Sequence, residues 1–175
     1  MAIPPFVAAV LLVLLLAIAY PLFPATGYAQ LSDGIGAWLE FMTLPALALA
    51  AVPAALLTRQ VRGALIDAME EDYVRTARAK GLRKGPIVAK HAAKNAAVPV
   101  VTVVGLVVTQ MIGGAVVVER VFGIPGLGSV SVESVLTGDL ITLQGLVLVT
   151  ALVVITVNLL VDMSYGYFNP RLRTR

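Results

Sequence analysis

The chain has 175 residues, of which 59% are hydrophobic and only 13% are charged, and its mean hydropathy is +0.92. Soluble globular domains carry about 25% charged residues, so this composition excludes an ordinary soluble domain. The absence of cysteine excludes disulfides, thiolate catalysis and cysteine-based metal sites.

Four apolar stretches are each long enough to cross a bilayer, which takes roughly 20 apolar residues in a helix. They cover residues 6–23, 41–58, 96–118 and 140–161, and none of them contains Lys, Arg, Asp or Glu. Because backbone polar groups in lipid must be satisfied within their own segment, each stretch is predicted to be an α-helix. The predicted fold class is all-α: a polytopic membrane protein with four transmembrane helices in a single domain, 1–175.

The basic residues are concentrated between the second and third spans. Nine of the thirteen lie in 59–94 and three more lie at the C-terminus, whereas 24–40 has none and 119–139 has only Arg120. Segments rich in Lys and Arg stay in the cytoplasm. The sequence therefore predicts that both termini and 59–94 are cytoplasmic, and that 24–40 and 119–139 are external. This topology accounts for the net charge of +3 without a nucleic-acid partner.

The cytoplasmic segment 59–94 is predicted to form two helices joined by a turn. Acidic residues precede basic ones between Asp67 and Lys80, an order that complements a helix dipole. Gly81 is a predicted helix stop, and Gly85-Pro86 starts the second helix with Pro in its first turn. The tip mixes small and basic side chains: Arg75, Thr76, Ala77, Arg78, Ala79, Lys80, Gly81 and Leu82. On physical grounds it is either a docking surface for another protein or a solvated basic loop on anionic lipid.

Several motifs, in one order along the chain, resemble the permeases of ABC importers. DYVRTARAKGL (72–82), GGAVVVERVFGIPGLG (113–128) and NLLVD (158–162) are similar to the EAA-type loop and later segments of the dipeptide/oligopeptide/nickel permease family, in its B-type form. The resemblance covers about residues 40–173. It implies part of a type I ABC importer permease fold in the cytoplasmic membrane of a bacterium or archaeon.

The resemblance also implies partners and a mode of energy supply. The tip 75–82 would be the coupling helix, seated on one of two ATPase subunits that bind ATP and Mg. The other implied partners are a second, C-type permease subunit and an extracytoplasmic substrate-binding protein, all within membrane lipid. The chain itself has no G-x-x-x-x-G-K-[ST] phosphate loop, so we expect a transporter subunit that is not an enzyme and binds no cofactor.

Other interpretations of the chain stay open. B-type subunits usually have six spans, and this sequence begins before what resembles the third, so a truncated or split, non-transporting remnant is one alternative. A membrane-embedded enzyme would need titratable groups at membrane depth, and a channel would need a filter or charged constriction; the spans offer neither pattern. The substrate stays open among dipeptides, oligopeptides, nickel chelates and other small solutes.

Polar residues within the spans suggest weaker sites. Thr109 and Gln110 in the third span are candidates for lining a pore or for an interhelical hydrogen bond. Asn158 and Asp162 lie about one helical turn apart, and we predict a structural polar clasp rather than a proton relay. Gly105, Gly113 and Gly114 would allow close helix packing. No residue is predicted to be catalytic or to bind a metal.

Overall fold

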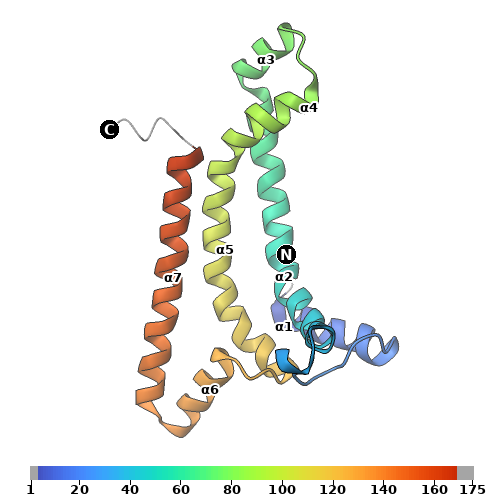
Figure 1. The fold of residues 1–175 in the computed structure, drawn as a ribbon, viewed down its shortest axis with the longest axis vertical. Helices are drawn as coiled ribbons and strands as arrows, with labels where there is room; N and C mark the ends of the chain where they lie inside the picture. The colour runs from blue at the N-terminus through green and yellow to red at the C-terminus, as the bar shows by residue number, and fades with distance from the viewer. Residues whose placement is uncertain (1–3, 169–175) are drawn as a thin grey trace. The chain divides into compact units, whose positions relative to one another are not determined.

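A computed structural model describes residues 4–168 of the chain, and every regular element in that range is helical (Figure 1). This confirms the predicted all-α class. The three C-terminal arginines that contributed to the topology prediction lie outside the described residues.

Three of the described helices are long and apolar enough to cross a membrane: α2 (Ile35–Glu70), α5 (Ala93–Phe122) and α7 (Leu140–Phe168). They contain the second, third and fourth predicted spans. The 36 residues of α2 reach roughly 54 Å, well beyond a hydrocarbon core of roughly 30 Å. The helix of the second span therefore continues into the segment predicted to be cytoplasmic.

The first predicted span forms a shorter apolar helix. It comprises α1 (Pro5–Val13) and the π-helical turn η1 (Leu14–Ala19), nine and six residues long. Helical geometry ends at Tyr20, which has an extended backbone (φ −123°, ψ 91°) because the residue before a proline, here Pro21, disfavours the helical region. The helix reaches roughly 22 Å, so a complete crossing at 6–23 stays a prediction.

One compact unit consists of residues up to Ala54 together with Thr109–Val153. Its core contains Ala9, Leu44, Ala48, Val118 and Phe122. The short 3-10 helix η2 (Leu31–Asp33) precedes α2, and α6 (Leu127–Thr137) follows α5.

The second compact unit consists of Ala55–Val108 and the chain from Val154 onward. It holds the last turns of α2, then α3 (Asp72–Ala79), α4 (Lys84–Pro86), η3 (Ile87–Ala92) and the first turns of α5. Four alanines form one of its cores, and their small side chains let two helices approach closely: Ala64, Ala68, Ala92 and Ala96. The single helix predicted over 67–80 is interrupted at Glu71, whose backbone is extended (φ −64°, ψ 149°).

Candidate functional site

The helix α3 and the segment that follows it form a closed elbow in the second unit (Figure 1). Val74 and Ala77, one helical turn apart, are buried against Ile87 of η3; Val74 and Ile87 are fully inaccessible. The Tyr73 hydroxyl donates a hydrogen bond of 3.0 Å to the carbonyl oxygen of Ala68, which ties α3 to the end of α2. The elbow is therefore a packed structure with its own small core.

A glycine in the left-handed region ends α3. Gly81 has φ +77°, and its N–H donates to the Arg78 carbonyl at 2.9 Å while the Leu82 N–H donates to the Ala77 carbonyl at 3.2 Å. These two bonds form a Schellman motif, which satisfies carbonyls left unpaired at a helix end. The predicted helix stop at Gly81 is confirmed, and so is a helix beginning around Gly85-Pro86.

The structure corrects one member of the predicted docking tip. Ala77 is buried inside the elbow, so it does not offer a small side chain to a partner. The physical reason is the period of the helix, which places Ala77 on the same apolar face as Val74. The other side chains of the tip are exposed: Arg75, Thr76, Arg78, Ala79, Lys80 and Leu82.

The charged side chains of the tip have few partners among the described residues. Arg75 pairs with Asp72 at 3.4 Å, but the two side chains are 75% and 93% exposed, and ion pairs in such positions contribute little to stability. The Thr76 hydroxyl donates to the Asp72 carbonyl at 3.0 Å. The cationic groups at the tip are thus accessible to another molecule.

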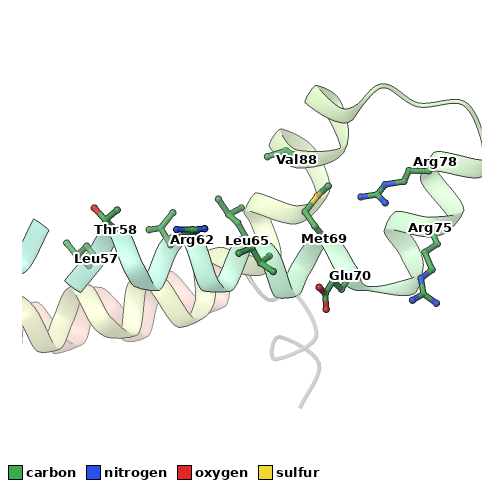
Figure 2. A pocket seen from close by; sticks show the side chains of 11 residues that line it. Leu57, Thr58, Arg62, Leu65, Met69, Glu70, Arg75, Arg78 and Val88 are labelled. Atoms are coloured by element: carbon green, nitrogen blue, oxygen red, sulfur yellow. The ribbon is translucent and has the colours of Figure 1, made fainter. Parts of the chain in front are cut away.

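Figure 2 shows a groove beside the tip, with a volume of about 1080 Å³. A row of apolar side chains on the extended end of α2 forms one wall, and Arg75 and Arg78 stand on α3. The lining contains three arginines and a single carboxylate, Glu70, so the groove favours an acidic surface. The lining residues are Leu57, Thr58, Val61, Arg62, Leu65, Ile66, Met69, Glu70, Arg75, Arg78 and Val88. The sequence did not predict this groove because the second span was expected to end at residue 58.

The polar residues proposed for the membrane region differ in exposure from helix to helix. On α5, Thr109 is half-buried and Gln110 is exposed. On α7, Asn158 and Asp162 are both exposed, and in the described part of the chain no hydrogen bond joins them. A pore-lining role for the first pair and a clasp for the second stay predictions.

A polar contact that the sequence did not predict joins α5 to α7 within the second unit. The hydroxyl oxygens of Thr102 and Tyr165 lie 2.7 Å apart. Close by, a Cβ built on Gly105 would lie 2.8 Å from Val161 Cγ2, whereas one on Gly113 would meet open space. Close packing is confirmed for Gly105. The Thr102–Tyr165 pair is separated by 63 residues, so spacing within one helix could not indicate it.

The known proteins that this chain is similar to are all described as parts of transport systems. A family model described as "Binding-protein-dependent transport system inner membrane component" matches residues 1–174. The dipeptide transport system permease protein DppB of Haemophilus influenzae is 48% identical over 135 residues, which are 77% of this chain and 40% of that protein. A putative peptide transport system permease protein of Brucella abortus is 38% identical over 171 residues, 98% of this chain and 54% of its own length. The glutathione transport system permease protein GsiC of Pectobacterium atrosepticum is 46% identical over 140 residues, 80% of this chain and 45% of that protein. The chain spans about half the length of the curated relatives it matches.

Proposed function

Because the chain belongs to the family of binding-protein-dependent transport system inner membrane components, we propose that it is a permease subunit of an ATP-driven ABC importer. It forms part of the translocation path and couples to a separate ATPase through 59–94. Relatives named for dipeptide, peptide and glutathione transport support peptides or a similar small solute as the substrate.

The observation that carries this proposal is the construction of the elbow. A solvated basic loop needs no core, yet α3 is closed on η3 by fully inaccessible side chains, Val74 and Ile87. The outer face of the same helix keeps its cations exposed. One face of α3 is therefore fixed by packing, and the other presents cations to solvent. A helix built in this way can receive a force from another protein.

A path for that force runs through the described contacts. Displacement of α3 would act on α2 through the Tyr73–Ala68 hydrogen bond and on α5 through η3, which leads directly into it. The two long helices would then move together at their cytoplasmic ends. Hydrolysis of ATP, with its Mg, would take place in the partner.

The proposed assembly contains a second permease subunit of C type, two ATPase subunits and an extracytoplasmic substrate-binding protein. It resides in the cytoplasmic membrane of a bacterium or archaeon, with both termini of this chain in the cytoplasm. The density of basic residues in 59–94 supports that orientation.

The test is to replace one cation of the tip in the assembled transporter. Arg78→Ala should lower both ATPase co-purification and uptake about tenfold, because truncating a central interface arginine typically costs that much or more. Lys94→Ala removes a cation that is also exposed and belongs to 59–94, but lies on α5 and outside the tip 75–82, so it should leave both at the wild-type level. Equal behaviour of the two variants would contradict coupling through the tip.

A further inference from the structure

Glu119 lies one turn before the end of α5, where the chain reverses toward α6. The residue is half-buried, and its carboxylate Oε2 accepts a hydrogen bond of 2.7 Å from the backbone N–H of Ser129. Ser129 is the third residue of α6, so this N–H is one of the donors that a helix leaves unpaired at its N-terminus. A side chain from α5 thus caps the following helix.

The start of α6 has no cap of its own. Its N-cap position is Gly126, which has no side chain, and no acidic residue lies in its first turn. Capping carboxylates satisfy N–H groups and interact favourably with the positive end of the helix dipole. Glu119 provides both interactions from outside the helix.

Two glycines make room for this arrangement. A Cβ on Gly126 would overlap the carboxyl group of Glu119, and a Cβ on Gly128 would lie 2.5 Å from the Cα of Val116. The second contact is with backbone, which cannot rotate away. Any side chain at Gly128 would therefore push α6 away from α5.

Two further hydrogen bonds close the same turn. The Ile124 N–H donates to the Glu119 carbonyl at 2.9 Å, and the Ser129 hydroxyl donates to the Ile124 carbonyl at 3.0 Å. Glu119 thus accepts one hydrogen bond from the turn and one from α6.

We propose that Glu119, Gly126 and Gly128 form a joint that fixes the direction of α6, and that Glu119 is a positioning residue for uptake. This role rests on the proposed function, in which α6 lies on the outer side where substrate arrives. The helix exposes large apolar side chains, among them Leu127 at 55%, Val135 at 63% and Leu136 at 76%. Fixing α6 determines which way these side chains face a molecule at the outer surface.

The joint is tested by hydrogen–deuterium exchange of 127–132, with the protein in a lipid bilayer. Glu119→Ala should speed exchange about tenfold or more, because a hydrogen bond to a charged group is lost. Glu119→Gln keeps the shape and a neutral acceptor of roughly half the strength, so its exchange should be intermediate. Gly128→Ala should also speed exchange although the carboxylate is present.

The matched control is Glu133→Gln, since Glu133 is an exposed acid on α6 itself; it should exchange at the wild-type rate. Uptake is then measured in the assembled transporter. Glu119→Ala and Gly128→Ala should lower the maximal uptake rate about tenfold while ATPase co-purification stays at the wild-type level, because the elbow is untouched.

The outcomes separate the joint from the proposed function. Unchanged exchange in Glu119→Ala overturns the joint. Faster exchange with wild-type uptake overturns the positioning role and leaves the permease function standing. If the wild-type chain itself supports no uptake, the proposed function fails, and the exchange result still supports or overturns the joint.

Discussion

At the scale of single residues, Gly81 carries the geometry of the elbow. Its φ of +77° lies in the left-handed region, which costs a residue with a side chain about 1–2 kcal/mol. A Cβ there would meet nothing within 4 Å, so the cost of substitution comes from the backbone alone. Gly81→Val should therefore redirect the tip without disturbing a packed neighbour.

The expected result of Gly81→Val is normal membrane insertion with weaker ATPase co-purification, or ATP hydrolysis that no longer drives uptake. Gly85→Ala is the control, because Gly85 has equally open space without a positive φ. Wild-type uptake by Gly81→Val would contradict a mechanical role for the turn. Ala77→Glu would act differently, because it would place a charge in the buried core of the elbow and disrupt the elbow itself.

Asp139 gives a prediction about pH. Hydrogen bonds from the Thr142 hydroxyl and the Thr142 backbone N–H hold the pKa of Asp139 below its ordinary value. The folded pKa is lower than the unfolded one, so the stabilisation of the start of α7 is present above about pH 3.9 and is lost as the pH falls through the folded pKa.

An NMR titration of the Asp139 carboxyl carbon, with the protein in a membrane mimetic, measures this shift. Thr142→Val removes the hydroxyl and keeps the backbone donor, so the pKa of Asp139 should rise toward the ordinary value. An identical titration curve in wild type and Thr142→Val would show that the hydroxyl is not the main cause.

At the scale of elements, α5 and α7 pack closely at Gly105 in the second unit. An added methyl at Gly105 would meet Val161 Cγ2 at 2.8 Å, and valine, branched at Cβ, has little rotamer freedom in a helix. Gly105→Ala should therefore destabilise the protein by about 1–3 kcal/mol through overpacking. Val161→Ala in the same chain removes the obstructing methyl groups and should restore much of the loss.

A double-mutant cycle on thermal stability in detergent measures this coupling, because residues in contact deviate from additivity. Gly113→Ala is the control, since a Cβ there has open space. Strictly additive effects of Gly105→Ala and Val161→Ala would contradict the contact.

The elements themselves were largely predictable, and their ends were not. Uncharged apolar runs located α2, α5 and α7 because such runs must form helices in lipid. The continuation of α2 beyond residue 58 was not predicted, because Arg59 and Arg62 indicate the end of an apolar span whereas arginine is also a good helix former. The break at Glu71 has no glycine or proline to signal it; it accompanies the packing of Val74 against Ile87, a contact that sequence periodicity does not encode.

The candidate site was predictable in position and less so in orientation. The concentration of basic residues and the position of Gly81 located the tip. The order of acidic and basic residues along the helix predicted on which side α3 ends. The burial of Ala77, the groove along α2 and the joint at Glu119 all depend on which side chains meet in space. In each case the sequence shows the residue types but not the partner.

At the scale of the whole molecule, the long helices present apolar surface that the described residues leave exposed. The apolar windows of α2, α5 and α7 are only 17%, 11% and 0% buried within the described residues. A helix that is apolar all round needs lipid or another subunit against it. The proposals for the tip and for the joint at Glu119 both depend on which side of the membrane each of them lies.

Labelling of introduced cysteines tests that sidedness. The chain has no native cysteine, so each substitution gives a single reporter. Ser32, Thr76 and Thr137 are exposed and lie in three different predicted loops. With an impermeant thiol reagent, Ser32→Cys and Thr137→Cys should react in intact cells, whereas Thr76→Cys should react only after permeabilisation. The reverse pattern would invert the topology, placing α3 where no cytoplasmic ATPase can reach it and α6 where no external protein can.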